Sequence, residues 1–471
     1  MKLLFEKSVE GRRCTLLPEN DVPEVALPKS LQRETPLRLP ELSENDVTRH
    51  YSAIERRTFG VNNGFYPLGS CTMKYNPKIN EFAAALPNFT EIHPLQPAHT
   101  MKGCFELYEL CEKYLNDITG MDAFSFLPAA GAHGEFAGLL MIKKYHTSRG
   151  DTKRNKLIVP DSAHGTNPAT AAMCNMKVIN IESGRDGCVD LEKLRAVVGE
   201  DTAGIMLTNP NTVGMFEKDV VEISKIVHEA GGLLYYDGAN LNSIMGYARP
   251  GDMGFDVVHL NLHKTFAAPH GGGGPGSGAV GCKNILKPYM PLYTGEERKE
   301  SIGRIKQFYG NFSTVVKAFT YILTLGCDGL PEVSKNAVLN ANYFKSLLSK
   351  SYKIAYDGIC MHEFIVTLEK EAKTHDVTAR DISKSLLDNG IHPPTMYFPL
   401  VVNEALMVEP TETEGKEGLD QAADVFLKVY KEAMADPQYA RGTPYKAAIR
   451  RPDEVKAARD PVVRYNFSKT S

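Results

Sequence analysis

One stretch decides the fold: Asp256-Val-Val-His-Leu-Asn-Leu-His-Lys-Thr-Phe266. Its short apolar run at residues 257–262, close to glycine and proline clusters, is typical of a buried strand in a parallel sheet. The strand ends in a polar tip, where Lys264 lies between His263 and Thr265. Rigid backbone there would hold the lysine partly out of water, and a desolvated amine with cationic neighbours is available for a Schiff base. The alternative is a solvated lysine at a strand end, because most lysines are exposed.

The composition is that of a globular protein. Of the 471 residues, 42% are hydrophobic and 24% are charged, which allows more than one domain and a large core. The formal net charge of −3 gives no sign of a general nucleic-acid or membrane-surface binder. Nine scattered cysteines without a C-x-x-C pair indicate reduced thiols rather than a disulfide framework. Reduced thiols lead us to expect a cytoplasmic protein. We also recognise no signal peptide and no membrane-spanning run.

Helical and strand-like patterns alternate through the middle of the chain. Helices are expected at residues 103–119, after 134, from 190 and at 219–230, and residues 161–172 are expected to form a turn that leads into a helix. Strands are expected at residues 157–160, 177–181, 204–208, 233–236 and 257–262. Repeated strand–helix units predict an α/β fold, with a mainly parallel sheet covered by helices on both faces.

The pattern of the sequence changes near residue 330. We expect residues 1–90 to form an N-terminal arm and an active-site loop, residues 91–330 a large domain, and residues 331–471 a smaller C-terminal α+β domain. Residues 1 to about 60, which form the arm, are rich in Pro, Glu and Arg, so the arm either wraps a neighbouring chain or is a poorly ordered tail. In the smaller domain, helices are expected at 337–348, 376–389 and 419–433, with a strand at 363–368.

A small-residue turn at residues 129–134 separates a short apolar piece from a helix. Strand, turn and helix start in this order present free backbone N–H groups to a phosphate. No Gly-Lys-Ser/Thr follows, so the turn is not a Walker loop. The four glycines at 271–274 do not lie between a strand and a helix, as a dinucleotide fingerprint requires, so we expect a mobile or close-packed loop there.

Four polar residues lie just past the ends of expected strands: His164, Asn211, Asp237 and Lys264. Ligands of open parallel sheets bind at the carboxyl ends of the strands, so these side chains are expected to share one edge. A lysine amine, an acid on a neighbouring strand, an aromatic ring for stacking and a phosphate-binding turn are what pyridoxal phosphate requires.

Several linked segments carry a family resemblance. They are Tyr66-Pro-Leu-Gly-Ser-Cys-Thr-Met-Lys-Tyr-Asn-Pro77, Pro128-Ala-Ala-Gly-Ala-His-Gly-Glu135, Asp161-Ser-Ala-His-Gly-Thr-Asn-Pro-Ala169, Thr208-Asn-Pro-Asn-Thr212, Asp237-Gly-Ala-Asn-Leu-Asn242, Asn261-Leu-His-Lys-Thr-Phe266 and the four-glycine run. In this order they resemble the glycine cleavage system P-protein, glycine dehydrogenase (decarboxylating), a fold-type I pyridoxal-phosphate enzyme. The chain resembles the lysine-bearing half of the split form of this family, its subunit 2.

The resemblance implies a role for each matching residue. Lys264 would form the Schiff base with pyridoxal 5'-phosphate, and Asp237 would pair with the pyridine nitrogen. His164 would stack on the ring, and Ala132 and His133 would supply backbone groups to the phosphate.

Two further assignments rest on looser similarity. Asn211 would contact the ring hydroxyl, by likeness to the Asn-Pro turn of aminotransferases. His263 is either a packed neighbour of the lysine or a phosphate contact.

The resemblance also implies an activity and partners. Glycine would be decarboxylated with release of CO2, and its aminomethyl group transferred to the lipoyl group of H-protein. Subunit 1 would complete an α2β2 heterotetramer. Two alternatives stay open: another fold-type I reaction, such as that of an aminotransferase or a serine hydroxymethyltransferase-like enzyme, and a purely structural half of the pair, against which Lys264, Asp237 and His164 argue.

Overall fold

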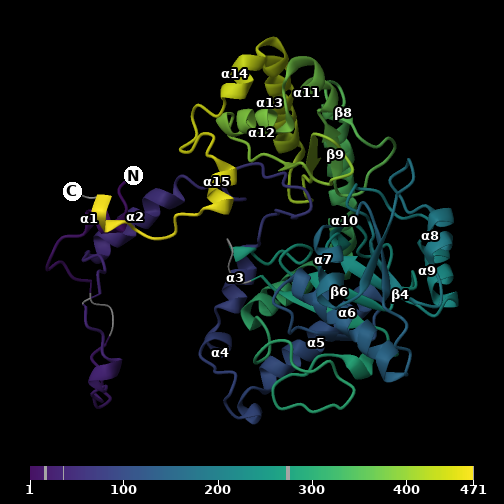
Figure 1. Cartoon of the computed structure of the whole chain (residues 1–471), viewed down its shortest axis with the longest axis horizontal. Helices are drawn as coiled ribbons and strands as arrows, with labels where there is room; N and C mark the ends of the chain where they lie inside the picture. The colour runs from purple at the N-terminus through teal and green to yellow at the C-terminus, as the bar shows by residue number, and fades with distance from the viewer. Residues whose placement is uncertain (15–17, 36, 272–275, 470–471) are drawn as a thin grey trace. The chain divides into compact units, whose positions relative to one another are not determined.

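The computed structural model describes residues 1–14, 18–35, 37–271 and 276–469 (Figure 1). Its contacts divide the chain into two units, residues 1–60 with 446–471 and residues 61–445. Short helices joined by extended segments make up the first unit: α1 Leu4–Lys7, η1 Lys29–Leu31, α2 Glu44–Glu55, α15 Glu454–Arg459 and η6 Phe467–Lys469. Ring stacking of Phe5 on Tyr465, with centroids 4.6 Å apart, holds its two chain segments together.

A seven-stranded sheet forms the centre of the second unit. Along the sheet, the strands are β1 Ala123–Ser125, β7 Gly278–Cys282, β6 Val257–Asn261, β5 Leu233–Gly238, β4 Thr202–Thr208, β2 Lys156–Pro160 and β3 Lys177–Ile181. The neighbours from β6 to β3 are parallel, whereas β7 is antiparallel to both β6 and β1. The prediction of a mainly parallel α/β sheet is confirmed.

Successive side chains of the central strands pack alternately into two separate hydrophobic cores. Tyr236 and Val258 point into one core, while their neighbours Tyr235 and Val257 point into the other. This alternation follows from the pleat of a strand, and it requires apolar cover on both faces. Helices α5 (Lys102–Thr119) and α9 (Val220–Glu229) cover the first face, and helix α6 (Gly131–Ser148) covers the second. Because both faces are buried, the strands are nearly continuous apolar runs in the sequence.

The helices of this part agree broadly with the expected segments. They are α3 Lys78–Ala84, α4 Pro87–Thr90, α5 Lys102–Thr119, α6 Gly131–Ser148, α7 Thr166–Met173, α8 Leu191–Val197 and α9 Val220–Glu229, with the turns η2 Ala98–Thr100, η3 Leu241–Ser243 and η5 Lys287–Tyr289. Asp190 caps α8, because its carboxylate accepts hydrogen bonds from the N–H groups of Glu192 and Lys193. Gly120, at φ +71°, ends α5.

A second, four-stranded antiparallel sheet follows the first. Its strands are β10 Thr395–Met396, β11 Ala405–Val408, β9 Phe364–Thr367 and β8 Lys353–Ile354, packed with α11 Glu369–His375, α12 Ala379–Asp388, α13 Lys416–Ala435 and α14 Pro437–Gly442. Helix α10 Phe312–Leu348 crosses residue 330 and changes direction at Gly326. The boundaries proposed at residues 90 and 330 stay predictions.

Helix α12 begins later than expected. Asp376 ends α11 with φ +54°, and the new helix starts only after Thr378. The Thr378 hydroxyl and the Asp381 carboxylate form a reciprocal capping box, which fixes the first turn at Ala379. The expected helix at 376–389 is therefore shorter at its start.

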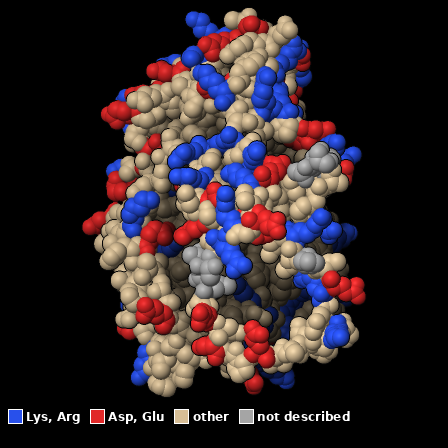
Figure 2. Space-filling model, turned by 90° about the vertical axis from the view of Figure 1, so that its left-hand side faces the viewer, with Lys and Arg blue, Asp and Glu red and all other residues tan. Residues whose placement is uncertain are grey.

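Surface and cysteine chemistry agree with the composition. The face in Figure 2 carries Lys and Arg side chains interspersed with Asp and Glu, in keeping with the formal net charge of −3. All nine cysteines are free thiols.

Within the described ranges, no helix has both the length and the apolarity that crossing a membrane requires. The four-glycine run extends into residues 272–275, which lie outside the described residues.

Candidate active site

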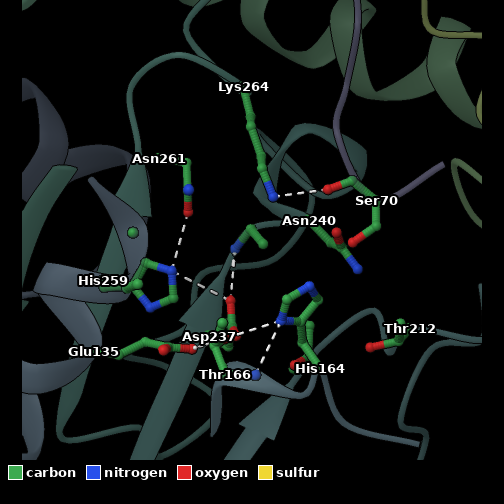
Figure 3. Close-up of a pocket in the computed structure, with 14 residues that line it drawn as sticks. Ser70, Glu135, His164, Thr166, Thr212, Asp237, Asn240, His259, Asn261 and Lys264 are labelled. Carbon is green, nitrogen blue, oxygen red and sulfur yellow. Dashed lines mark hydrogen bonds and ion pairs between the residues drawn. The ribbon is translucent and has the colours of Figure 1, made fainter. Parts of the chain in front are cut away.

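Polar side chains from several strand ends and loops meet around one cavity (Figure 3). Its lining is formed by Ser70, Gly131, Ala132, Glu135, His164, Thr166, Thr208, Thr212, Asp237, Ala239, Asn240, His259, Asn261 and Lys264. Asp237 lies near the end of β5, and Lys264 follows β6, the parallel neighbour of β5. The structure thus brings together Lys264, Asp237, His164 and Ala132, four of the residues predicted from sequence.

Lys264 reaches from the tip of β6 toward a turn that is distant in sequence. Its Nζ donates a 2.7 Å hydrogen bond to the carbonyl oxygen of Ser70. Ser70 has φ +66°, a left-handed backbone conformation that a non-glycine residue rarely adopts without outside support. The turn at residues 69–72, here called the Ser70 turn, is therefore part of the lysine's surroundings.

Asp237 is buried, and its hydrogen bonds favour its charged form. One carboxylate oxygen accepts from Asn167 Nδ2 at 3.0 Å and the other from the Ala239 N–H at 3.0 Å. Burial acts to raise the pKa of Asp237, but His259, these hydrogen bonds and Lys264 lower it below its usual value. A carboxylate that stays ionised in a dry site suits a cationic partner such as a protonated ring nitrogen.

His259 is the neighbour of Asp237 across the sheet, and sequence reasoning gave it no role. Its Nε2 lies 3.3 Å from Asp237 Oδ1, and its Nδ1 lies 2.5 Å from the Tyr235 hydroxyl. Burial lowers the pKa of His259, so the ring is neutral. A neutral ring that accepts from Tyr235 at Nδ1 carries its proton at Nε2, facing Asp237. The signal was present in the opening stretch, where His259 stands alone in an apolar run.

Glu135, a second buried acid beside Asp237, was also missed. Burial and the charge of Asp237 raise the pKa of Glu135 from 4.5 to about 8. Hydrogen bonds from Thr166, Thr170 and Asn167 act in the opposite direction. At neutral pH the cavity therefore holds one neutral and one ionised carboxyl group, because two adjacent buried carboxylates repel each other.

The raised pKa of Glu135 predicts a pH-dependent stability difference. The folded protein keeps a proton that the unfolded chain loses, so stability from this group is present below pH 4.5 and is lost as the pH rises to about 8. Relative to Glu135→Gln, the wild-type free energy of unfolding should fall across this window, by at most about 1.4 kcal/mol per pH unit, and then level off. Urea unfolding from pH 4.5 to 9 measures this difference, and a rise with pH would contradict it.

His164 lies between β2 and α7 with its ring held by its neighbours. Thr166 donates its N–H to Nδ1 at 3.2 Å, and its hydroxyl oxygen lies 2.9 Å from the same atom. Phe398 packs edge-on with ring centroids 5.3 Å apart. Burial lowers the pKa of His164, which keeps the imidazole neutral and suited to stacking on an aromatic ring.

The start of α6 offers a site for an anion. Ala130 precedes the helix without a side-chain cap, and no acidic side chain lies in the first turn. The first backbone N–H groups of such a helix have no intrahelical acceptor and carry the positive end of the helix dipole. Gly131 and Ala132 line the cavity, and a Cβ at Gly131 would lie 2.4 Å from Asn261 Nδ2. This donor set fits a phosphate group beside the lysine.

Three predicted residues lie outside the cavity lining. His133 follows Ala132 in α6, and its Nδ1 accepts the Ala129 N–H at 3.1 Å. His263 has its Nδ1 3.1 Å from the Ser277 carbonyl and its Nε2 3.4 Å from Asn261 Nδ2.

Asn211 is fully engaged in its own turn, and the adjacent Thr212 lines the cavity instead. The Asn211 amide nitrogen donates to the Gly187 carbonyl and to Glu217, at 2.9 and 2.8 Å. Its oxygen accepts from the N–H groups of Val213 and Met215. A ring contact would require these hydrogen bonds to break.

A buried ion pair ties the segment after the Ser70 turn to the backbone beside Lys264. Lys74 Nζ lies 2.6 Å from Glu412 Oε1 and donates to the Thr265 carbonyl at 2.7 Å. Burial acts to lower the pKa of Lys74, but Glu412 and Tyr321 outweigh it and raise the pKa above its ordinary value. Lys74 therefore stays charged and links the loop after β11, through Glu412, to the loop after β6, through Thr265.

Removing this anchor should destabilise the protein strongly. Lys74→Met would leave the Glu412 carboxylate buried without its partner, which typically costs about 3–5 kcal/mol. Urea unfolding followed by circular dichroism measures the loss. The matched control is Lys193→Ala, whose partner Glu182 is exposed, and it should leave unfolding unchanged. Equal behaviour of the two variants would contradict the prediction.

Comparison with known proteins decides the family. A protein of Treponema denticola called "Probable glycine dehydrogenase (decarboxylating) subunit 2" is 59% identical over 474 residues, covering 98% of each chain. This chain belongs to the glycine dehydrogenase (decarboxylating) subunit 2 family. A relative of the same name from Caldanaerobacter subterraneus subsp. tengcongensis is 56% identical over 477 residues, again covering 98% of both chains.

Family models and a solved structure agree with this membership. The family described as "Glycine dehydrogenase, C-terminal domain" matches residues 333–443, and "Aminotransferase class-V" matches residues 137–308. The crystal structure of glycine decarboxylase (P-protein) of the glycine cleavage system, in inhibitor-bound form, superposes with a TM-score of 0.72. It covers 86% of this chain and 93% of its own, and at 20% identity it supports the fold.

Proposed function

We propose that this chain is the lysine-bearing subunit of a pyridoxal-phosphate-dependent glycine dehydrogenase (decarboxylating). The reaction is decarboxylation of glycine, with release of CO2 and transfer of the aminomethyl group to the lipoyl group of H-protein. The observation that carries the proposal is that Lys264, Asp237 and His164 line one cavity beside the start of α6. The family supports glycine as the substrate.

Each group of the cavity has a distinct task in this proposal. When bound, pyridoxal 5'-phosphate supplies an electron sink for the bond that breaks as CO2 leaves. Lys264 attaches the cofactor through Nζ and can hold a proton at that atom once released. Asp237 pairs with the ring nitrogen, and His164 stacks on the ring face. His259 and Asn167 orient the Asp237 carboxylate by their contacts with its oxygens.

The helix start and the nearby histidine complete the cofactor site. Ala132 and His133 offer backbone N–H groups of α6 to the phosphate, as the free donors of that helix start allow. His263 lies in the turn after β6, where the contact of its Nδ1 with the Ser277 carbonyl supports the role of a packed neighbour of the lysine over that of a phosphate contact. Asn211 stabilises the turn that places Thr212 at the cavity.

The proposed partners are subunit 1, with which this chain would form an α2β2 heterotetramer, and lipoylated H-protein. The name of the relatives, which designates them subunit 2, supports a second subunit. A cytoplasmic location fits nine unpaired thiols.

One reconstitution tests the proposal against its alternatives. The chain with subunit 1, lipoylated H-protein and pyridoxal phosphate should exchange labelled bicarbonate into glycine, and omission of H-protein should abolish most of the exchange. An aminotransferase would instead form an oxo acid without H-protein, and a serine hydroxymethyltransferase-like enzyme would require a folate. Failure of exchange with every component present would refute the proposal.

A further inference from the structure

A second cluster of buried titratable groups lies outside the cavity lining. Glu363 directly precedes β9, and Glu409 directly follows β11, the antiparallel partner of β9. With His362 they bring one ligand atom each to within 4.8 Å of one another, and all three are 0% exposed. Both ring nitrogens of His362 and Oε1 of Glu363 have no hydrogen-bond partner in the described chain. Buried groups of this kind require an explanation.

Both carboxyl groups hold the Ser70 turn. The Ser70 N–H donates to Glu363 Oε2 at 2.7 Å. The Thr72 N–H donates to Glu409 Oε2 at 2.9 Å, and the Thr72 hydroxyl donates to Oε1 at 2.7 Å. Ser70 and Thr72 both have positive φ, at +66° and +51°. Non-glycine residues keep a left-handed conformation only where the surrounding structure stabilises it. Here the hydrogen bonds to Glu363 and Glu409 stabilise it.

The same turn reaches the lysine from its other side. The carbonyl of Ser70 accepts the 2.7 Å hydrogen bond from Lys264 Nζ, while the N–H of the same residue is bound to Glu363. The small sheet and the lysine tip of the large sheet are therefore linked through one residue.

We propose that Glu363 and Glu409 are positioning residues for Lys264. By accepting the N–H groups of Ser70 and Thr72, they fix the turn that places the Ser70 carbonyl against the lysine amine. This inference rests on the proposed role of Lys264 as the cofactor-binding lysine.

The charge state of the pair agrees with this role. Burial and the neighbouring Glu409 raise the pKa of Glu363 well above its usual value, although the Ser70 hydrogen bond and Lys264 oppose this. Burial raises the pKa of Glu409 to about 7, with Thr72 and Lys264 opposing and Glu412 assisting. Glu363 is thus a neutral acid at neutral pH, and glutamine reproduces its shape and its acceptor oxygen.

Cys71 is a built-in reporter, because it lies between the two anchored residues. Burial raises the pKa of the Cys71 thiol, so alkylation is slow while the turn is held. The chain, co-expressed with its partner subunit and stripped of cofactor, is treated with iodoacetamide, and each cysteine is followed by peptide mass spectrometry. Cys14 and Cys327 are exposed and serve as internal references, each compared with itself in the wild type.

At position 363, an oxygen that accepts the Ser70 N–H should be enough to hold the Ser70 turn, and a negative charge should not be needed. Glu363→Ala leaves the half-buried Ser70 N–H without its acceptor, so we expect alkylation of Cys71 at least about tenfold faster than in the wild type. Glu363→Gln keeps the acceptor and should stay within about threefold. Wild-type alkylation in Glu363→Ala, or equal acceleration in both variants, would overturn the proposal. So would one bound metal equivalent in the wild type that Glu363→Gln loses, because the cluster would then be a metal site.

A second pair of variants tests Glu409 without altering the buried acids. Thr72→Ala removes the hydroxyl that donates a hydrogen bond to Glu409, and Thr72→Ser keeps a hydroxyl at this position. We expect Cys71 alkylation at least about threefold faster in Thr72→Ala and close to wild type in Thr72→Ser. This pair keeps the proposal testable if Glu363→Ala fails to fold, which circular dichroism reports. Equal rates in the two Thr72 variants would overturn the role of Glu409.

A readout at Lys264 completes the test. In the cofactor-loaded complex, borohydride trapping of pyridoxal phosphate on the Lys264 peptide should be at least about fivefold slower in Glu363→Ala and restored in Glu363→Gln. If trapping occurs at another lysine while Cys71 still responds to the variants, the proposed function fails and the hold on the turn stands. If Lys264 is trapped equally in all variants, the positioning role fails and the proposed function stands.

Discussion

Replacement of Lys264 by alanine should reduce glycine–bicarbonate exchange at least about 10³-fold. The variant lacks the amine that attaches the cofactor and that can hold a proton at the reacting centre. Lys264→Arg should be similarly inactive, because a guanidinium keeps the charge but is not a nucleophile at neutral pH. The measurement is the exchange rate of the complex with subunit 1 and lipoylated H-protein.

The control for this prediction is a lysine on the surface of the same domain. Lys193 pairs with the exposed Glu182, and Lys193→Ala should keep full exchange activity. Circular dichroism should show both variants folded. Exchange within tenfold of wild type in folded Lys264→Ala would mean that another group carries the chemistry.

Asp237→Ala should lower the exchange rate by about 10²–10³-fold. The carboxylate is the ionised member of the buried acid pair, and without it a cationic ring nitrogen would have no charged partner in the cavity. Asp237→Asn keeps the shape and one acceptor oxygen, so it should lose nearly as much activity while preserving the fold. The visible spectrum of the loaded complex should also shift, since the ring nitrogen would lose its proton.

The Asp237 variants also lose structural contacts, so their stability must be measured alongside their activity. Both variants leave His259 Nε2 without its charged neighbour, and alanine also leaves Asn167 Nδ2 without one acceptor. Thermal unfolding separates this structural cost from the loss of chemistry. Full activity in a well-folded Asp237→Asn would refute the pairing of this carboxylate with the cofactor.

The features that could be predicted from sequence are those with local causes. The apolar run before Lys264 and the acid at the end of β5 identified two neighbouring strand tips, because strand ends of a parallel sheet meet at one edge. Strand β7, rich in glycine, has too weak a pattern to recognise, and strand β1, with three residues, could be recognised only as a short apolar piece. Helix α6 starts at Gly131 without a capping side chain, so its first turn carried no sequence signal.

The remaining site residues depend on contacts between distant segments. Asp237 raises the pKa of Glu135 only because the fold places α6 beside β5. Ser70 and Glu363 are separated by 293 positions, so no local pattern could pair them. Asn211 shows the converse: an asparagine after a strand looks the same in sequence whether it faces a ligand or closes its own turn.

Reductive trapping of the cofactor tests the central claim most directly. The complex is loaded with pyridoxal phosphate, reduced with borohydride, digested and analysed by peptide mass spectrometry. The account predicts one pyridoxyl group per chain, on the peptide that contains Lys264, and no label in Lys264→Ala. A label on a different lysine of the wild type, or the same amount of label in the variant, would contradict it.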